Sequence, residues 1–308
     1  MNKPLLTHAA QTMRNGSKSF DAAARLFDPQ TRRSVLMLYT WCRHCDDAID
    51  NQIAGFACGE QSALTPAQQL ARLQESTLQV YRMETPLDPA FAALQEVTAR
   101  HHIPVKWPLE HLEGFAMDVR GERYLTIDDT LRYCYHVAGV VGLMMAHIMG
   151  VRDDKVLDRA CDLGLAFQLT NIARDVIEDA HAQRCYLPAE WLAQEGLDAR
   201  TCHRVENRPA LFRVVQRLLM TAEPYYVSAL AGLPALPLRS RWAIATARDV
   251  YRAIGVKVAH AGATAWDTRQ HTSKPEKIAL LLKGAGRAAI APAVASPPRP
   301  ASLWQRPL

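Results

Sequence analysis

"DLGLAFQLTNIARDVIEDA" (residues 162–180) joins a strongly apolar segment to a group of acidic side chains. At about 100° per residue, helical positions four apart are displaced by only about 40°, so Asn171, Asp175 and Asp179 form one stripe. Glu178 falls on the same side of the helix. Because apolar residues lead directly into the stripe, we expect it to begin inside the protein, where carboxylates need a compensating partner.

"CRHCDDAID" (42–50) is a second acidic segment, with Asp46 and Asp50 one turn apart on a helical face and Asp47 beside them. A lone acidic string is usually a solvated helix end, but two strings in apolar surroundings predict a shared site. Facing carboxylates repel one another. Magnesium ions relieve that repulsion because they prefer oxygen ligands and bridge carboxylates to phosphates.

Basic and thiol side chains accompany the acidic segments. Arg43 and Arg174 each adjoin a carboxylate cluster, where they either form local ion pairs or hold phosphate oxygens. Cys42 and Cys45 match a C-x-x-C pattern, but no second pair accompanies them. We therefore expect both thiols to pack in the helix core and not to bind zinc.

Composition places the chain among ordinary globular proteins. Its 308 residues, 49% apolar and 22% charged, are enough to bury a large core. Seven irregularly spaced cysteines indicate free thiols, and the N-terminus lacks the features of a signal peptide, so we predict a cytoplasmic protein. The segment 271–308 carries the whole net charge of +5, which argues against a nucleic-acid-binding face.

Helix signals dominate the sequence. Asp28, Thr65 and Asp88 each precede a proline, a pairing typical of helix N-termini. Helices are predicted over 30–50, 67–83 and 90–101, and near 107–123, 129–150, 155–180, 207–231, 237–266 and 275–291. No strand is predicted. The predicted fold class is all-α, with a single helical domain over 1–291 and a proline-rich tail over 292–308 that is extended or disordered.

The longest apolar stretch, "VAGVVGLMMAHIMGV" (137–151), is shorter than the roughly 20 residues that span a bilayer. We interpret it as a central core helix. Gly139 and Gly142 leave one side of this helix thin. The helix therefore either packs closely against a neighbour or leaves room for a long apolar ligand.

The segment "PEKIALLLKGAGRAAIA" (275–291) mixes apolar and basic residues. Ile278, Leu281, Leu282 and Ile290 occur with lysine and arginine between them, a pattern typical of weak interfacial helices at anionic membrane surfaces. A terminal helix packed on the bundle is the alternative, and the sequence alone leaves both open.

Four blocks together resemble the signature motifs of the squalene and phytoene synthase family. They are "GSKSF" (16–20), "YTWCRHCDDAID" (39–50), "YCYHVAGVVG" (133–142) and "QLTNIARDVIEDAHAQRCYLP" (168–188). The similarity to the bacterial phytoene synthases extends from about residue 8 to 270 and includes the terminal "LWQRPL". Gly16 departs from the related dehydrosqualene synthases, where histidine is expected, and so removes one expected diphosphate contact.

The resemblance implies a class I isoprenoid synthase fold, a bundle of antiparallel helices around a deep apolar cavity. It assigns about three magnesium ions, replaceable by manganese, to Asp46, Asp50, Asn171, Asp175 and Asp179. Contacts to the diphosphates are implied for Ser17, Lys18, Ser19, Arg43, Arg174, Arg184 and Tyr251. Tyr39, Tyr135 and Gln168 would line the reacting ends of the substrates.

The implied reaction joins two molecules of geranylgeranyl diphosphate head to head through prephytoene diphosphate and gives phytoene, in the first committed step of carotenoid biosynthesis. Asp46, Asp50, Asp175 and Tyr135 are the implied catalytic residues, and either Tyr135 or released diphosphate is the base. No NADPH is expected, and no site is visible for ATP, a possible stimulant of bacterial relatives. The implied partners are other carotenoid-pathway enzymes and the inner face of the membrane, without nucleic acid.

Alternative functions compete with phytoene synthesis. Squalene or dehydrosqualene synthesis would use farnesyl diphosphate, and squalene formation would end with hydride transfer from NADPH. We expect no C-terminal membrane span, which argues against squalene synthesis. A non-catalytic assembly factor would have lost acidic residues from these motifs, whereas both acidic motifs are intact. A terpene cyclase would not need "YCYHVAG" (133–139).

"SFDAAARLF" (19–27) places three consecutive alanines after the Ser-Lys-Ser corner, where the substrate tail should begin. Relatives that use farnesyl diphosphate carry a bulky aromatic residue in place of Ala24. We predict that this small side chain deepens the cavity by one isoprene unit. The alternative is that Ala24 faces solvent or merely packs tightly as a helix former.

Overall fold

The computed structural model describes residues 3–50, 52–53, 56–57, 64–85, 88–293 and 296–307, with backbone alone at Lys3, Lys18, Ser19, Asp50 and two short strands. In chain order the helices are α1 (Lys3–Gly16), α2 (Lys18–Ala24), α3 (Pro29–Asp50), α4 (Pro66–Tyr81), α5 (Pro89–His101), α6 (Lys106–Val119), α7 (Ile127–Cys134), α8 (Val140–Ile148), α9 (Asp154–His181), α10 (Ala189–Gln194), α11 (Arg208–Leu230), α12 (Leu238–Ala261) and α13 (Lys274–Ile290). A π-helix, η1 (Tyr135–Gly139), joins α7 to α8, and the strands are β1 (Gln52–Ile53) and β2 (Phe56–Ala57).

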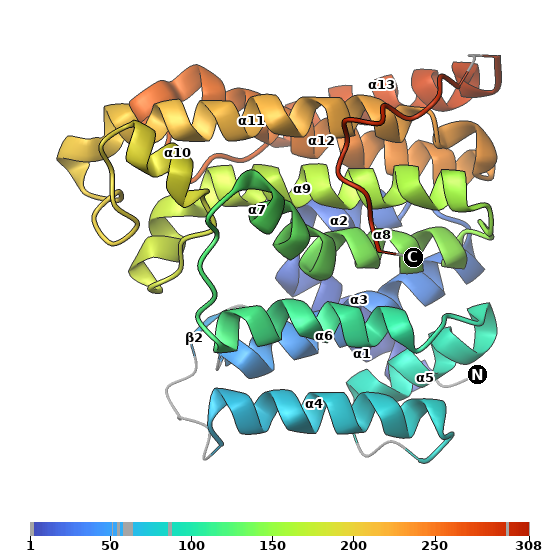
Figure 1. Cartoon of the computed structure of the whole chain (residues 1–308). Coiled ribbons are helices and arrows are strands. Elements are labelled where there is room, and N and C mark those ends of the chain that lie inside the picture. The colour runs from blue at the N-terminus through green and yellow to red at the C-terminus, as the bar shows by residue number, and fades with distance from the viewer. Residues whose placement is uncertain are drawn as a thin grey trace.

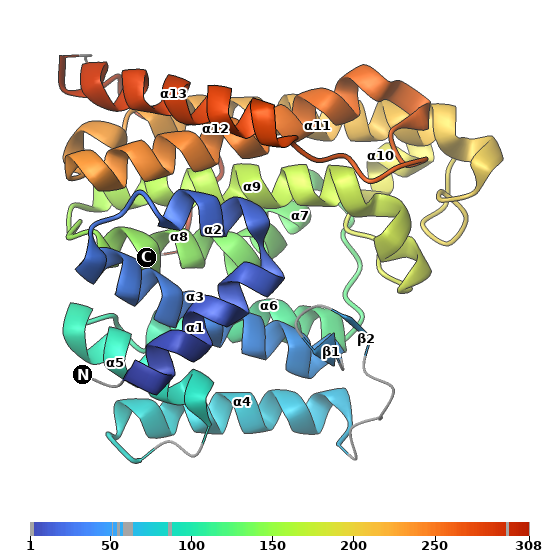
Figure 2. The ribbon, with the colours of Figure 1, turned by 180° about the vertical axis from the view of Figure 1, so that it is seen from behind.

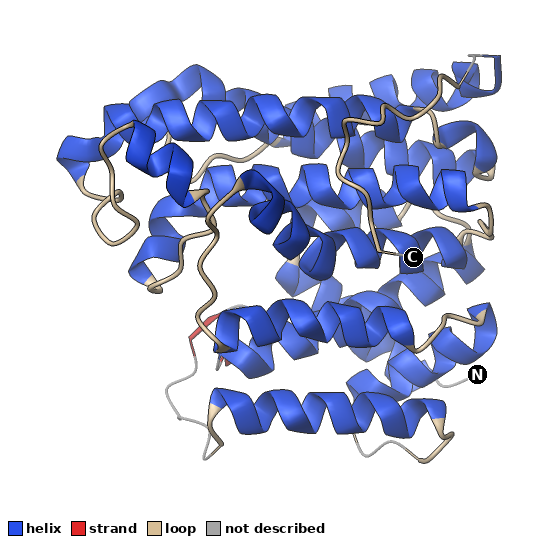
Figure 3. Cartoon of the chain, in the orientation of Figure 1, coloured by secondary structure: helices blue, strands red, loops and turns tan. Residues whose placement is uncertain are grey.

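The architecture confirms the predicted all-α class (Figure 3). The prediction of no strand is wrong at one place, because β1 and β2 pair antiparallel, with Gln52 opposite Ala57. Two residues per strand are too few to produce an alternating sequence pattern. Helices α1 and α10 were also not predicted.

The predicted capping residues begin three of the helices. The hydroxyl of Thr65 accepts a hydrogen bond from the main-chain N–H of Gln68, whose side chain accepts one from the N–H of Thr65. Asp88 accepts a hydrogen bond from the N–H of Ala90 at 2.7 Å. Asp28 binds the first turn of α3 in the same way. Each cap satisfies main-chain donors that have no partner within the helix.

Helix α9 runs through the middle of the bundle (Figure 1). It packs against α11 and α12 on one side and against α8 and η1 on the other, and α13 covers α12. Seen from behind, α1, α2 and α3 cover the other face (Figure 2). Leu165, Ala166 and Leu169 of α9 are completely buried. The helix that carries the acidic stripe is therefore also the centre of the core.

Helices α8 and α9 approach each other as closely as glycine allows. A Cβ atom at Gly142 would lie 2.4 Å from the main-chain oxygen of Ala160, and one at Gly164 would lie 2.4 Å from that of Ala138. Any larger side chain would push the two helices apart. The close-packing interpretation of 137–151 is thereby confirmed.

Residues 296–307 correct the expected disorder of the tail. The segment is extended, as predicted, but it packs across α9 and α8 on the outside of the bundle (Figure 1). Arg299 binds the fully buried carboxylate of Asp162 through hydrogen bonds of 2.9 and 2.7 Å. The main-chain N–H of Trp304 donates to the hydroxyl of Tyr225 at 3.1 Å. Prolines exclude a helix here, but they do not exclude packing.

Helix α13 is a terminal helix packed on the bundle. The indole N–H of Trp242 on α12 donates to the main-chain oxygen of Leu281 at 2.9 Å. Ile278 and Leu282 nevertheless stay exposed, at 62% and 66%. No helix within the described ranges combines the length and the apolar character needed to cross a bilayer.

Candidate active site

A cavity of about 1170 Å³ occupies the interior of the bundle, with walls from α2, α3, α6, α8, α9 and α12. Mainly apolar side chains, together with Arg159 of α9, line its inner part, beside the N-terminal halves of α3 and α9. Charged and amide side chains line the other end, toward the C-terminal ends of α3, α6 and α9, which we call the mouth. The mouth consists of Arg43, Asp46, Asp118, Asn171, Arg174, Asp175, Glu178, Arg184 and Arg269.

The C-terminal half of α3 supplies the first wall of the mouth. Tyr39, Arg43 and Asp46 line the cavity about one turn apart. Arg43 lies 2.9 Å from the carboxylate of Asp46 and 2.8 Å from that of Asp47. Burial alone would lower the pKa of Arg43, but the two carboxylates outweigh burial and raise it. The predicted metal ligand Asp50 lies outside the described side chains.

The acidic stripe of α9 forms the facing wall. Arg174 donates two hydrogen bonds to the carboxylate of Asp175, one of them 2.7 Å long. The side-chain N–H of Asn171 donates to the Oε1 of Gln168 at 3.3 Å. The Oδ1 atom of Asn171 is buried and accepts no hydrogen bond from the described residues. Because buried polar atoms are normally paired, this oxygen is available to a ligand.

The carboxylates near the mouth repel one another, and burial together with this repulsion raises the pKa of Asp179. Burial and the charge of Asp175, followed by that of Asp118, raise the pKa of Asp179 to about 8. Asp179 is not one of the described side chains that line the cavity. In the described part of the chain, no three Asp, Glu, His or Cys side chains converge on one metal position. Arginines hold the carboxylates of Asp46 and Asp175 instead.

Aromatic rings line the wall between α2, α9 and α12. Phe167 and Tyr251 stack with their ring centroids 4.2 Å apart, and Phe20 lies 5.4 Å from Tyr251. Tyr251 is buried and lines the cavity together with Arg174. The expected contact of Tyr251 with a diphosphate stays a prediction, and the three rings present π faces along this wall.

The Ser-Lys-Ser corner lies at the start of α2. The hydroxyl of Ser17 accepts a hydrogen bond from the N–H of Phe20 at 3.3 Å and so caps the helix. A Cβ atom at Gly16 would lie 2.3 Å from the hydroxyl oxygen of Tyr39. Glycine therefore lets Tyr39 approach this corner closely. The predicted contacts from Lys18 and Ser19 lie outside the described side chains.

Two basic residues that line the cavity, one at the mouth and one on α13, were not predicted. Arg269 lies 3.1 Å from the carboxylate of Asp175 and 3.7 Å from that of Glu178. Lys277 also lines the cavity. Both follow α12; the polar and basic segment "DTRQHTSK" (267–274) contains Arg269, and Lys277 comes three residues after it.

Tyr135 is buried at the start of η1. Its hydroxyl donates to Glu110 at 2.5 Å, and its ring centroid lies 5.5 Å from that of Trp304. Tyr135 is not among the described side chains that line the cavity, and its place at the reacting ends stays a prediction. The neighbouring Tyr133 lines the cavity and donates to Asp118 at 3.2 Å. The π-helix that begins at Tyr135 changes the direction of the side chains on this segment.

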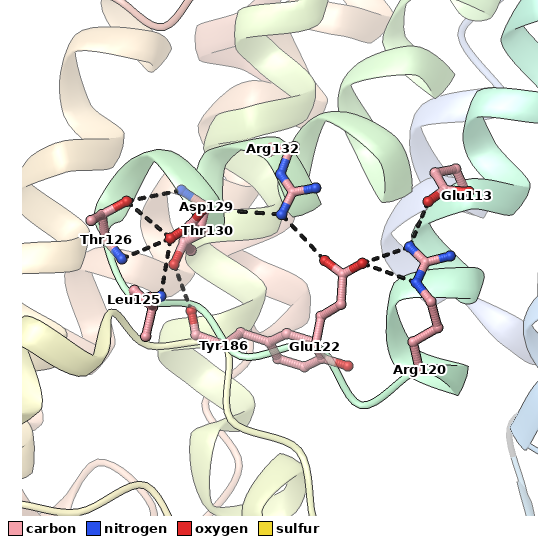
Figure 4. Close-up of polar contacts among 9 residues, drawn as sticks. All are labelled: Glu113, Arg120, Glu122, Leu125, Thr126, Asp129, Thr130, Arg132 and Tyr186. Carbon is pink, nitrogen blue, oxygen red and sulfur yellow. Dashed lines mark hydrogen bonds and ion pairs between the residues drawn. The ribbon is translucent and has the colours of Figure 1, made fainter.

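Hydrogen bonds along the α6–α7 connection hold the partners of Asp118 in place (Figure 4). Glu122 contacts Arg132 at 3.2 Å, and the hydroxyl of Thr130 donates to the main-chain oxygen of Tyr186 at 2.9 Å. The hydroxyl of Tyr186 in turn donates to Asp118 at 3.0 Å. The segment that carries Arg184 is thereby fixed against the mouth.

Comparison with known proteins places these features in a family. Residues 13–276 match the sequence model described as "Squalene/phytoene synthase". The chain belongs to the squalene/phytoene synthase family. It is 62% identical to a "15-cis-phytoene synthase" of Pantoea ananas, with 100% of both chains covered. It is 63% identical to a "Phytoene synthase" of Pseudescherichia vulneris, with 99% of each chain covered.

Structural comparison gives the same result. A solved dehydrosqualene synthase in complex with a ligand is 27% identical, with a TM-score of 0.81 over 92% of this chain and 96% of that chain. The predicted isoprenoid synthase bundle is therefore confirmed. The squalene/phytoene synthase family uses prenyl diphosphates and generally depends on a divalent metal. An apolar cavity with a charged mouth suits such substrates, because the tail and the diphosphate need opposite surroundings.

Proposed function

We propose that the chain condenses two molecules of geranylgeranyl diphosphate head to head, through prephytoene diphosphate, to phytoene and diphosphate. The observation that carries this proposal is a cavity of about 1170 Å³ in which a mainly apolar interior meets a mouth of arginines and carboxylates. The interior encloses the prenyl tails, and the mouth receives the diphosphates. The 62% identity to a 15-cis-phytoene synthase over the full chain supports phytoene rather than squalene as the product.

The residues of the mouth fit a divalent metal. Asp46, Asn171 and Asp175 would hold it; Asp50 and Asp179, which the family resemblance also implies, are not among the described side chains that line the cavity. The unpaired Oδ1 of Asn171 supports this assignment, because oxygen donors of this kind are preferred by magnesium. A bound magnesium ion would supply positive charge that stabilises the departing diphosphate.

The arginines of the mouth are arranged for phosphate binding. Arg43 and Arg174 hold their carboxylates through exchangeable ion pairs, and guanidinium groups bind phosphate oxygens equally well. Arg184, Arg269 and Lys277 add charge from three other segments. Together they attract the diphosphate and orient the bond that breaks.

The remaining walls protect the cations formed during the reaction. Departure of diphosphate leaves an allylic cation, which the double bond of the second substrate attacks. A proton is lost to give the cyclopropyl intermediate, whose own ionisation, rearrangement and proton loss give phytoene. The faces of Phe20, Phe167 and Tyr251 stabilise positive charge, and the apolar interior excludes water that would capture the cation.

Product analysis tests this function directly. Purified protein is incubated with magnesium and either geranylgeranyl or farnesyl diphosphate, with and without NADPH. We expect phytoene from geranylgeranyl diphosphate at a rate that NADPH does not change. Formation of squalene from farnesyl diphosphate in the presence of NADPH, without phytoene from the longer substrate, would contradict the proposal.

Chain-length selection is expected to depend on Ala24. This residue is buried at 2% exposure and lines the cavity, so it does not face solvent. We expect Ala24→Phe to shorten the cavity and to lower kcat/KM for geranylgeranyl relative to farnesyl diphosphate by about tenfold or more, through steric exclusion. The measurement is the ratio of kcat/KM on the two substrates.

A matched control is available on the same helix. Ala22 is exposed, so Ala22→Phe introduces the same side chain outside the cavity. Overpacking by Ala24→Phe can cost about 1–3 kcal/mol of stability, so both variants are first shown to be folded by circular dichroism. A folded Ala24→Phe protein with the wild-type ratio would show that this position does not set cavity depth.

We further propose that α13 makes peripheral contact with an anionic membrane. Arg287, Arg299 and Arg306 form ion pairs with aspartates of the bundle, so most of the tail's arginine charge is used internally. The exposed side chains of Ile278 and Leu282 support a contact that is mainly apolar. A long prenyl substrate and a C40 hydrocarbon product both partition into lipid, so a membrane contact would let them pass between the lipid and the enzyme.

The membrane contact is tested by removing apolar side chains. We expect Ile278→Ser with Leu282→Ser to weaken binding to phosphatidylglycerol vesicles by about tenfold or more, since each buried side chain contributes about 1.5–3 kcal/mol. The control is Met83→Ser with Leu125→Ser, which are equally exposed elsewhere. Co-sedimentation that falls equally in both double variants, or in neither, would rule out this face. Point variants are preferable to truncation, because truncation also removes Arg299 from Asp162.

A further inference from the structure

His111 is a side chain of the cavity to which neither the sequence nor the proposed function assigns a role. It lies on α6, is 4% exposed, and lines the cavity with Phe115 and Asp118 of the same helix face. Since a helix rises about 1.5 Å per residue, His111 lies roughly 10 Å from Asp118 along the helix axis. It is therefore beside the hydrocarbon part of a bound substrate and away from the mouth.

Hydrogen bonding fixes which nitrogen of His111 carries the proton. Nδ1 lies 3.2 Å from the main-chain oxygen of His136, which can only accept, so Nδ1 donates. Nε2 is buried and has no hydrogen-bond partner among the described residues. Burial lowers the pKa of His111 to about 4, so the ring is neutral near pH 7 and Nε2 keeps a free lone pair.

The surroundings of the ring leave this lone pair unused. Trp41 and Phe115 pack around His111 at centroid distances of 5.4 and 5.1 Å. The indole N–H of Trp41 is likewise buried without a partner in the described part of the chain, so it does not pair with Nε2. An unused acceptor on a cavity wall calls for a functional explanation, since buried acceptors are normally paired.

The proposed reaction requires a base inside the cavity. Its last step removes a proton from a carbon next to a cationic centre, within walls that exclude water. Tyr135 is bound to Glu110 outside the cavity. Burial raises the pKa of the Cys42 thiol to about 12, so that side chain is already protonated. Among the carboxylates of the mouth, Asp46 and Asp175 are engaged by arginines. Asp118 accepts hydrogen bonds from the hydroxyls of Tyr133 and Tyr186.

We propose that Nε2 of His111 accepts the proton in the last step of phytoene formation, an assignment that rests on the proposed function. The C–H bond beside the cation breaks, its electron pair becomes the new C=C bond, and the proton joins Nε2 to give an imidazolium. Water that enters when the product leaves takes this proton and restores the neutral ring. A weak base suffices because such a C–H group is strongly acidic, and weak basicity keeps the ring unprotonated between turnovers.

The test follows the fate of the cation in two variants. His111→Asn keeps an N–H group for the carbonyl of His136 and removes the nitrogen lone pair, whereas His111→Phe fills the same space. Each folded protein receives prephytoene diphosphate and magnesium, and released diphosphate and C40 products are quantified. We expect both variants to release diphosphate while phytoene formed per diphosphate falls about tenfold or more, in favour of C40 alcohols and double-bond isomers.

His147→Asn is the matched control. His147 packs against Trp107 at a centroid distance of 4.5 Å and is not among the side chains that line the cavity. The His147→Asn variant should therefore form as much phytoene per released diphosphate as the wild type. A wild-type phytoene-to-diphosphate ratio in both His111 variants, even with both rates reduced in parallel, would overturn the proposal and leave released diphosphate as the base. Failure of the wild-type protein to make phytoene from geranylgeranyl diphosphate would instead refute the proposed function.

Discussion

Asp175→Asn is expected to reduce phytoene formation by about a thousandfold or more while leaving the bundle folded. Asp175 lies on the central helix, between Arg174 and Arg269, at the mouth of the cavity. In the proposed reaction its charge is needed to hold a divalent metal beside the departing diphosphate. Loss of about 4 kcal/mol of transition-state stabilisation corresponds to about a thousandfold in rate.

The measurement is kcat at saturating magnesium and substrate, with Asp46→Asn as a second variant from the facing wall. Asp267→Asn is the control, because Asp267 is an exposed carboxylate in a surface ion pair with Arg208. That pair should contribute at most about 1 kcal/mol to stability and nothing to turnover. If Asp175→Asn keeps more than a tenth of the wild-type kcat, the metal-holding role of this residue is wrong.

The structure changes the expected effect of Asp175→Asn on stability. From the sequence alone, removing one of several repelling acids should raise the melting temperature. In the structure, Arg174 already neutralises Asp175 through two hydrogen bonds. Charge-assisted hydrogen bonds contribute about 1.5–3 kcal/mol each, so we expect a modest decrease instead. Assays are therefore run well below the melting temperature of each variant.

The sequence was most informative where short-range physics decides the structure. The stripe on α9 and the segment around Asp46 were found because helical spacing alone puts such residues on one face. The caps at Asp28, Thr65 and Asp88 were found because each acts on its own helix. The fold class and half of the mouth follow from these local patterns.

The other half of the mouth depends on contacts between distant segments. Arg269 reaches Asp175 only because α12 and the loop after it return to the end of α9. Asp118 was missed although it follows His111 by seven residues, a spacing that puts both on one face of α6. The surroundings of Tyr135 could not be read from helical spacing, because it begins a π-helix, and its role was implied by the family resemblance alone.

The tail was misjudged for a related reason. Its proline content correctly excluded a helix, but composition does not reveal a partner elsewhere in the chain. The partner is Asp162, which in the sequence appears as one acid at the start of an apolar run. Only the folded structure shows that this carboxylate is completely buried and that Arg299 reaches it.

Arg299→Met is expected to destabilise the protein by about 3–5 kcal/mol, because it leaves the buried carboxylate of Asp162 without its charged partner. Ser228 would remain as a hydrogen-bond donor to Asp162, but a hydroxyl does not compensate a full charge. At about 2.1 cal/mol/K of unfolding entropy per residue, a chain of 308 residues should lose about 5–8 °C of melting temperature. Calorimetry and urea unfolding measure both quantities.

Two further variants distinguish the stability cost of leaving the buried carboxylate of Asp162 unpaired from the cost of losing an ion pair at the surface. Arg252→Met removes an arginine whose partner is Glu223, in a pair with both side chains about 40% exposed, and should cost less than about 1 kcal/mol. Arg299→Met combined with Asp162→Asn removes both charges and should recover much of the lost stability, because the penalty comes from the unpaired carboxylate and not from the missing tail contact. A melting temperature for Arg299→Met equal to that of Arg252→Met would show that the tail does not bind Asp162 in solution.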